Sequence, residues 1–398
     1  MADSDGPLRY TLRVTIPADL LFPADGREAL AEILSWDGVR LASLAVSDFP
    51  VDVVRLDGSS SPPIVVSRSK RAETLKALPA SLRNRAQAAF ERAARRPRRL
   101  ELAHRRSLDL SSGPAIMGVV NVTPDSFSDG GQTFDAVLAT ERALALFEDG
   151  AAIVDVGGES TRPASYGAAR EVPAEEEIRR VVPVIEAVRK NTDRPLSVDT
   201  RKAAVARAAL EAGADLVNDV SALRFDPEMA RACAQSGAGL VLMHMKGRDP
   251  RTMQDDVSYA HPVADIAGEL ACAAAAALEA GVPADAIAVD PGLGFGKSPE
   301  GNLILLRHLA ALKSLGFPVA IGASRKAFVR RFSGVANDAT SPERLAGSLA
   351  CLAAASSAGA ALVRVHDVAD SARFLRMLRA ITALASSHAQ ASAGVAVR

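Results

Sequence analysis

The chain has 398 residues, of which 48% are hydrophobic, and this length is enough for one large domain together with a smaller one. Lys and Arg total 47, as do Asp and Glu, so the net charge gives no reason to expect a nucleic-acid or membrane partner. The three cysteines, Cys233, Cys272 and Cys351, are far apart and form no CxxC pair. They suggest no disulfide framework, which fits a reducing compartment, and we interpret them as small core residues of helices.

The sequence contains no recognisable targeting or membrane segment. Residues 1–7 lack the basic stretch and the following apolar stretch of a signal peptide. No apolar run approaches the roughly 20 residues that are needed to span a bilayer. We therefore expect a soluble protein of the cytoplasm.

Residues 1–112 differ in pattern from the rest of the chain and predict a small α+β extension. Strands are predicted over 10–16, 39–46 and 51–56, and a short helix is predicted over 25–35. No motif in the extension carries recognisable chemistry. Its role is therefore not predicted by the sequence.

A basic, helix-forming run covers residues 81–107, with nine arginines against two glutamates and Pro97 as an interruption. A run of this kind is usually a solvated face or a linker, and we interpret it in that way. Contact with an acidic partner or a nucleic acid is the alternative interpretation.

From residue 113 onward, eight apolar strand patterns alternate with helical patterns. Several of the helices end at a glycine, which is the expected left-handed cap before a strand. Eight such units over about 280 residues predict an α/β fold, a (β/α)8 TIM barrel over 113–385, followed by a C-terminal tail over 386–398. A doubly wound open sheet would need a Gly-rich fingerprint after its first strand, and none is present. The predicted strands are 115–122, 152–156, 195–198, 215–220, 239–243, 287–290, 319–322 and 361–365, and the predicted helices are 135–148, 175–190, 202–212, 227–236, 263–280, 299–315, 342–358 and 369–383.

Every predicted strand ends in a polar or ionisable group, and in a TIM barrel these ends meet on one rim. Asp199 or Asn218 taken singly could be a helix cap. Eight such groups on one rim are harder to explain structurally, because burying unpaired charge is costly. We therefore predict a functional site built from the strand ends. These groups are Asn121, Asp155, Asp199, Asn218, His244, Asp290, the run Ser324-Arg325-Lys326, and Arg364 with His366.

The chemistry of the predicted rim divides into two parts. One set offers donors and cation ligands suited to a phosphate or a diphosphate: Asn121, Thr161, Arg162, Arg364 and His366. The amide oxygen of Asn121 could also bind Mg²⁺, which prefers few protein ligands together with substrate phosphates. A second set suits a flat heterocycle with amide and amino edges: Asp199, Asn218, Asp290 and Lys326. No Walker loop, HExxH motif or Ser–His–Asp order supports covalent or zinc-dependent hydrolysis.

A set of eight motifs in this order resembles the dihydropteroate synthase family over about residues 115–380. The motifs are IMGVVNVTPDSFSDGG, DVGGESTRP, SVDT, NDV, LMHM, DPGLGFGK, GASRK and RVHDV. The resemblance implies a pterin-binding TIM barrel, a homodimer, Mg²⁺ as a cofactor and two small-molecule substrates. The implied reaction joins 6-hydroxymethyl-7,8-dihydropterin diphosphate to p-aminobenzoate and gives 7,8-dihydropteroate and diphosphate.

The resemblance also assigns residues to this reaction. It implies a pterin pocket at Asp199, Asn218, Asp290 and Lys326. The diphosphate pocket would use Asn121 with Mg²⁺, Thr161, Arg162 and the run Arg364-Val365-His366. Phe127, Pro163 and Ser324 match positions near the p-aminobenzoate end. Of all these residues, the ones expected to act in catalysis are Asp199, Lys326, Arg364 and His366.

The mechanism that this chemistry implies is an SN1-like substitution. Cations stabilise the departing diphosphate, and Asp199 stabilises the cation that is left on the pterin methylene. The segment 163–171 is a few residues longer than the usual family loop, which leaves the identity of the aryl amine open. The alternatives are a methanopterin-type synthase that uses a substituted aminobenzene, a pterin-binding methyltransferase domain and a non-catalytic paralogue.

Overall fold

In the computed structural model, the described residues are 39–41, 51–55, 64–66, 97–122, 132–160, 171–259, 262–336 and 342–395. The strand predicted over 10–16 and the helix predicted over 25–35 lie outside these residues. Four predicted site residues also lie outside them: Phe127, Thr161, Arg162 and Pro163.

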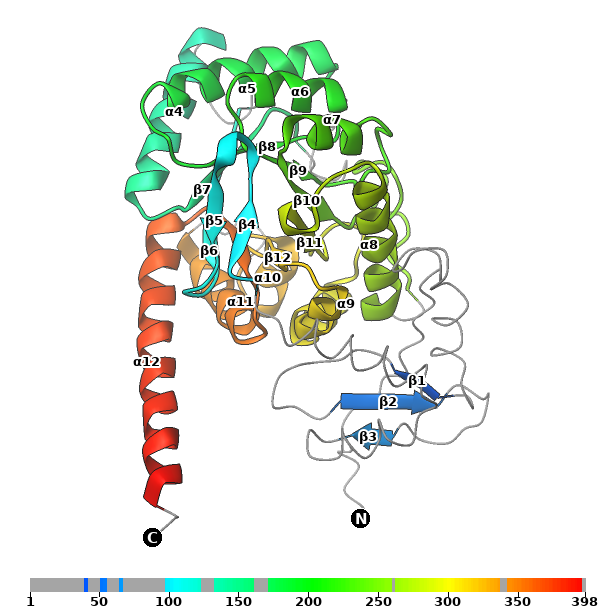
Figure 1. Cartoon of the computed structure of the whole chain (residues 1–398), viewed down its shortest axis with the longest axis vertical. Coiled ribbons are helices and arrows are strands. Elements are labelled where there is room, and N and C mark those ends of the chain that lie inside the picture. The colour runs from blue at the N-terminus through cyan, green and yellow to red at the C-terminus, as the bar shows by residue number, and fades with distance from the viewer. Residues whose placement is uncertain are drawn as a thin grey trace.

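Eight parallel strands form one sheet that closes into a barrel (Figure 1). The first barrel strand in the chain pairs with both the second and the last, so the first and last strands are neighbours in the sheet. The remaining gap is closed by a parallel bridge between Val289 and Val319, with the Val289 N–H donating to the Pro318 carbonyl at 2.9 Å. The (β/α)8 prediction is therefore confirmed. The strands are β6 (Ala115–Asn121), β7 (Ile153–Gly157), β8 (Leu196–Asp199), β9 (Leu216–Asp219), β10 (Gly239–Met243), β11 (Ile287–Asp290), β12 (Ala320–Ile321) and β13 (Leu362–Val365).

The helices surround the sheet (Figure 1), and most agree with the predicted ranges within a few residues. The helix predicted over 299–315 is divided at His308 into an α-helix and the 3-10 helix η9 (Leu309–Leu315). The last helix continues twelve residues beyond its predicted end at 383 and passes through most of the predicted tail. The described α-helices are α4 (Gln132–Glu148), α5 (Ala174–Arg189), α6 (Ala203–Glu211), α7 (Met229–Ser236), α8 (Pro262–Glu279), α9 (Pro299–Arg307), α10 (Ala327–Phe332), α11 (Leu345–Ser357) and α12 (Val368–Val395).

A two-stranded hairpin seals the N-terminal end of the barrel. Its strands are β4 (Arg99–Glu101) and β5 (Ser107–Asp109), and because β4 and the first residue of β5 lie in the predicted helix-forming run 81–107, that prediction is wrong for the part of the run that is described. The reason is an alternation with period two, in which Leu100, Leu102, Leu108 and Leu110 all face the core. These four leucines pack against the first residues of the barrel strands, such as Ala115 and Ile153.

A buried aspartate ties this hairpin to the barrel. Asp215, just before β9, is fully buried and accepts hydrogen bonds from Arg106 at 2.9 Å and from Arg189 at 2.7 Å. Its Oδ1 also lies 3.1 Å from His104 Nδ1. Arg106 and His104 therefore serve as structural anchors, although the sequence placed them in a solvated basic run.

The described residues before the hairpin form a three-stranded antiparallel sheet, β1 (Val39–Leu41), β2 (Val51–Arg55) and β3 (Ile64–Val66). The first two strands fall within predicted strands, and the third was not predicted. Whether the domain boundary lies at residue 112 stays a prediction. Among the described helices, none has both the length and the apolar character that crossing a membrane requires.

Candidate active site

Arg364 connects three strands across the interior of the barrel. Its Nε donates to Asp155 Oδ2 at 2.6 Å, and its Nη2 donates to Asp199 Oδ2 at 2.7 Å. In the sheet order, β13 is separated from β8 by β6 and β7, so a direct contact between side chains of these strands must pass through the barrel interior. The guanidinium group is therefore the point where the polar strand ends meet.

Asp155 accepts hydrogen bonds from three side chains at this meeting point. The side chain is fully buried and accepts hydrogen bonds from Ser197 Oγ at 2.6 Å and from Asn218 Nδ2 at 3.0 Å, as well as from Arg364. The amide oxygen of Asn218 is left free of that bond. Sequence reasoning placed Asp155 at a strand end but gave it no role, and it did not single out Ser197. Alternation along 153–157 could have signalled an inward-facing Asp155.

Asp199 and Asn121 lie side by side over Gly157. A Cβ atom added to Gly157 would lie 3.4 Å from Asp199 Cβ, 3.7 Å from Asp199 Oδ2 and 3.8 Å from Asn121 Oδ1. Burial raises the pKa of Asp199 to about 7, and Asp155 adds to this effect while Arg364 opposes it. A Cβ atom at position 157 would therefore be in van der Waals contact with both side chains, which places Asp199 and Asn121 on either side of the glycine.

Asp290 and Lys326 form the opposite part of the rim. Asp290 Oδ1 accepts the backbone N–H of Gly292 at 2.6 Å, and burial raises the pKa of this carboxyl group, opposed by the Lys326 ammonium. Lys326 donates to the Leu293 carbonyl and lies 4.5 Å above the centre of the Phe295 ring. Burial lowers the pKa of Lys326 to about 8, and Asp290 opposes the shift. The pair therefore places opposite charges in a largely dry environment.

His366 stands beside Ser324 at the ends of β13 and β12. Its Nδ1 lies 3.2 Å from Ser324 Oγ, and that hydroxyl also accepts the His366 backbone N–H at 3.3 Å. Burial lowers the pKa of His366 to about 3, and the cations Arg364 and Arg325 add to this effect. The imidazole is therefore neutral at physiological pH and can act as a hydrogen-bond donor, but not as a cation. Arg325 is paired with Asp367 instead of pointing toward the rim.

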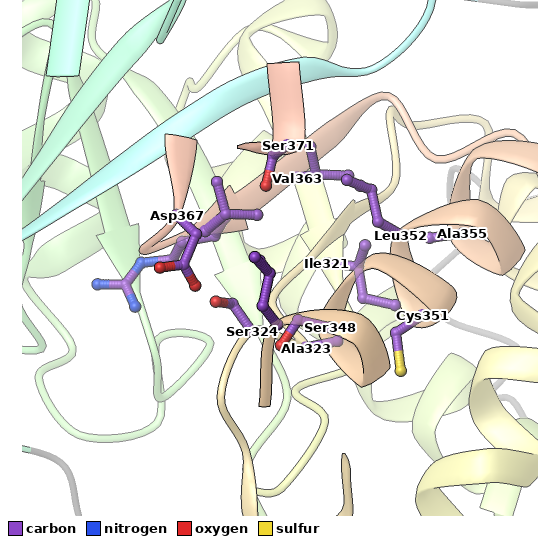
Figure 2. Close-up of a pocket in the computed structure, with 13 residues that line it drawn as sticks. Ile321, Ala323, Ser324, Ser348, Cys351, Leu352, Ala355, Val363, Asp367 and Ser371 are labelled. Carbon is purple, nitrogen blue, oxygen red and sulfur yellow. The ribbon is translucent and has the colours of Figure 1, made fainter. Parts of the chain in front are cut away.

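A cavity of about 20 Å³ lies behind Ser324, between β12, β13, α11 and the start of α12. Figure 2 shows its polar lining, which includes Ser324, Ser348 and Asp367. Its volume suits one water molecule, so it is not a site for an aromatic substrate. Val365, predicted to bind substrate, lines this cavity and belongs to the hydrophobic core.

His244, which follows β10, contacts a lysine and a glutamate that lie outside the predicted set of strand-end residues. Its Nδ1 lies 2.9 Å from Lys297 Nζ, and its Nε2 lies 3.2 Å from a carboxylate oxygen of Glu269. The expectation that all eight strand ends contribute side chains to one group is thus wrong for this histidine. Lys297 was not predicted as a site residue from the sequence, although it follows three closely spaced glycines.

A second buried ion cluster lies beside β8. Lys202 Nζ contacts Glu159 at 2.7 Å and Glu177 at 2.5 Å, and Glu159 also accepts the backbone N–H of Val172 at 3.2 Å. The carboxylate of Glu159 therefore connects β8 to the chain that follows the segment 161–170. Thr161 and Arg162 lie in that segment, outside the described residues.

The comparisons with known proteins agree with this architecture. A family model described as "pterin binding enzyme" matches residues 117–366. A dihydropteroate synthase of Synechocystis is 41% identical over 266 residues, which cover 67% of this chain and 89% of the relative. This chain belongs to the dihydropteroate synthase family. The matched region begins at β6, so the extension, β4 and β5 lie before it.

Two solved structures extend the comparison. The dihydropteroate synthase of Xanthomonas albilineans with 4-aminobenzoic acid is 44% identical, with a TM-score of 0.66, and the match covers 72% of this chain and 99% of that one. The same enzyme in complex with 7,8-dihydropteroate is 42% identical, with a TM-score of 0.63 and the same coverage. Both are similar to this chain over the whole barrel.

Proposed function

We propose that this protein condenses 6-hydroxymethyl-7,8-dihydropterin diphosphate with p-aminobenzoate to 7,8-dihydropteroate and diphosphate, a step of folate biosynthesis. The observation that carries the proposal is the contact of Arg364 with Asp155 and Asp199 inside a barrel of the dihydropteroate synthase family. A diphosphate leaving group requires a buried cation at the site of bond cleavage, and a pterin ring requires acceptors for its amino and amide N–H groups. The same rim provides both.

The pterin pocket is assigned to Asp199, Asn218, Asp290 and Lys326. A carboxylate can accept two parallel N–H donors from the edge of such a ring. Asn218 uses its amide nitrogen to hold Asp155, which leaves its amide oxygen for a ring N–H. Lys326 would donate a further hydrogen bond to the ring, because its buried Nζ interacts with the carboxylate of Asp290 in the same part of the site.

The diphosphate end is assigned to Arg364 and His366, with Thr161 and Arg162 assigned by sequence. Arg364 provides a fixed positive charge where negative charge develops on the leaving oxygen, and it needs no reorganisation at that moment because two aspartates hold it. The neutral His366 donates a hydrogen bond to a phosphate oxygen. Its imidazole is oriented by the contact between Nδ1 and Ser324.

Bond cleavage then precedes attack. The methylene–oxygen bond breaks with both electrons going to the diphosphate, and the ionised carboxylate of Asp199 stabilises the cation left on the pterin methylene. The amine of p-aminobenzoate attacks this carbon and loses a proton to solvent. No strong general base is needed, because an aryl amine is already nucleophilic.

The residues at the rim fit a bound Mg²⁺, which the family implies. Asn121 Oδ1 would be its protein ligand, and the other ligands would be water and diphosphate oxygens, as this hard cation prefers. Among the described residues, no cluster of three or more His, Cys, Asp or Glu could bind a metal by itself, and this matches a site that shares its ion with the substrate. Bound there, Mg²⁺ would neutralise part of the diphosphate charge.

The aryl amine is assigned as p-aminobenzoate, with Ser324, Phe127 and Pro163 near its end of the site. Support comes from the relative that was solved with 4-aminobenzoic acid. We also propose a cytoplasmic homodimer, on the basis of the family resemblance. The dimer is tested by light scattering of the purified full-length chain.

The test of the function is direct. The protein is incubated with the pterin diphosphate, Mg²⁺ and p-aminobenzoate, and both diphosphate release and dihydropteroate formation are measured. A parallel reaction replaces p-aminobenzoate with its ribosylated analogue, and another contains a metal chelator. Turnover with p-aminobenzoate alone supports the proposal. A folded protein without turnover would contradict it, and a preference for the analogue would assign it to the methanopterin type.

A further inference from the structure

The loop between β11 and α9 lies unusually close to the neighbouring chain. Gly292, Gly294 and Gly296 all have positive φ angles, 64°, 82° and 65°. A Cβ atom at Gly292 would overlap the backbone oxygen of His244, and one at Gly294 would lie 3.0 Å from Lys326 Cδ. The loop is therefore shaped to fit against β10 on one side and the Lys326 side chain on the other.

Lys297 contacts this loop through its buried Nζ atom. The side chain is 4% exposed, and its Nζ lies 2.9 Å from His244 Nδ1, 3.3 Å from the His244 carbonyl oxygen and 2.8 Å from the Phe295 carbonyl oxygen. These three polar atoms surround Nζ, and burial lowers the pKa of Lys297 well below its usual value. None of them is a carboxylate, which is unusual for a buried lysine.

The carboxylates of Asp290 and Glu269 partly oppose the lowering of the Lys297 pKa. His244 uses Nδ1 for the contact with Lys297, which leaves Nε2 for a contact on the other side of the ring. Nε2 is 3.2 Å from Glu269, which also contacts Arg224 at 3.0 Å. The Nε2 contact lacks hydrogen-bond geometry, so the imidazole lies between Lys297 and a carboxylate on α8 without a hydrogen bond to that carboxylate.

The same loop holds Lys326 in place. Lys326 donates to the carbonyl of Leu293 and lies over the ring of Phe295. The carbonyl oxygen of Phe295 is one of the three polar atoms around Lys297 Nζ. Lys297 and Lys326 thus both contact backbone carbonyls of residues 293–295.

We infer that Lys297, supported by His244 and Glu269, is a positioning residue that fixes the loop 293–295 and thereby directs the Lys326 ammonium toward the pterin. It acts through Lys326 and touches no reacting atom. The inference rests on the proposed function, because it takes Lys326 to bind the pterin. It predicts that a change at Lys297 affects the pterin substrate and leaves p-aminobenzoate binding alone.

The test replaces Lys297 with Met, which keeps the length of the side chain and removes the Nζ group with its three polar contacts. We expect the KM for the pterin diphosphate to rise about tenfold, while the KM for p-aminobenzoate stays within about twofold of the wild-type value. Calorimetry with 6-hydroxymethylpterin, which lacks the diphosphate, should show a similar loss of affinity. Equal affinity of the wild type and the variant for this pterin would overturn the inference.

Two further variants separate positioning from stability. Arg189→Met removes a partly buried cation at the opposite end of the barrel and should lower Tm without changing either KM. Glu269→Gln removes the carboxylate of a half-exposed residue and should raise the KM for the pterin about threefold in a protein that folds normally. If Lys297→Met does not fold, Lys297→Gln and Glu269→Gln decide the matter, and unchanged pterin binding in both would overturn the inference. Wild-type protein that neither turns over nor binds the pterin would instead contradict the proposed function.

Discussion

The two ends of the barrel use buried charge in opposite ways. At the N-terminal end, Asp215 is surrounded by Arg106, Arg189 and His104 beneath a layer of leucines, so one anion has several donors. At the C-terminal end, the single cation Arg364 is shared by two aspartates. The first arrangement holds a hairpin in place. The second has two carboxylates for one guanidinium, which leaves a charge that a bound ligand can balance.

The pKa shifts at the C-terminal end follow from this difference. Burial raises the pKa of Asp199 and lowers the pKa of Lys326, because neither charge is fully offset by protein groups. Ionisable groups with strongly shifted pKa values tend to cluster at functional sites, and a substrate of complementary charge would offset the cost of burying them. The comparison therefore predicts that substitutions at one end change catalysis, while those at the other change stability.

The largest effect is expected for Arg364→Ala. It removes the cation that faces the leaving group, so turnover should fall by roughly 10²–10³-fold. Binding of the diphosphate substrate should weaken by about 1.5–3 kcal/mol, the value of a charged hydrogen bond. Steady-state kinetics and calorimetry measure the two effects, and unchanged substrate binding would count against the assignment of Arg364.

A smaller and purely structural effect is expected for Arg189→Met. The variant removes one of the donors of Asp215, so the free energy of unfolding should fall by about 2 kcal/mol. Urea denaturation measures this change. The kcat and both KM values should stay at wild-type levels, and a change in either KM would break the proposed separation of the two ends.

The smallest effect is a bell-shaped pH dependence of kcat/KM. Asp199 must be ionised to stabilise a cation, so activity should be lost as pH falls through its raised pKa of about 7. Lys326 must be charged, so activity should also be lost as pH rises through its lowered pKa of about 8. Between pH 7 and pH 6 the acid limb should cost about fivefold. A profile that is flat from pH 5.5 to pH 7 would rule out a role for an ionised Asp199 with this pKa.

Much of the fold could be predicted because its signals are local. The strands at 239–243 and 287–290 were predicted at the observed bounds, since a buried parallel strand is a short apolar run between helical patterns. The hairpin before the barrel was not predicted, because the arginines of this segment favour a solvated basic run, and the alternating leucines of 100–110 were not interpreted as strands. The break at His308 was missed because helical periodicity continues through it.

For the site, local signals predicted a set of residues, and the roles of these residues in binding and catalysis stay predictions. Residue type and position placed Asp199, Asn218, Asp290, Lys326, Arg364 and His366 on one rim. Neither type nor position indicates that Asp155 would hold Arg364, or that His244 would turn toward Lys297. These contacts join residues that are far apart in sequence, and Asp155 and Arg364 are separated by 209 positions.

By itself, the sequence of this protein determined that eight strands and their helices would form and that polar groups would lie at or shortly after the strand ends. It could do so because apolar periodicity, glycine caps and residue chemistry act over a few neighbouring residues. Only the tertiary structure decided which of these groups share a charge, which are buried and which contact residues outside the predicted set. Closure of the barrel sets the distances between distant strands, and burial sets the strength of each charge, so both are properties of the whole fold.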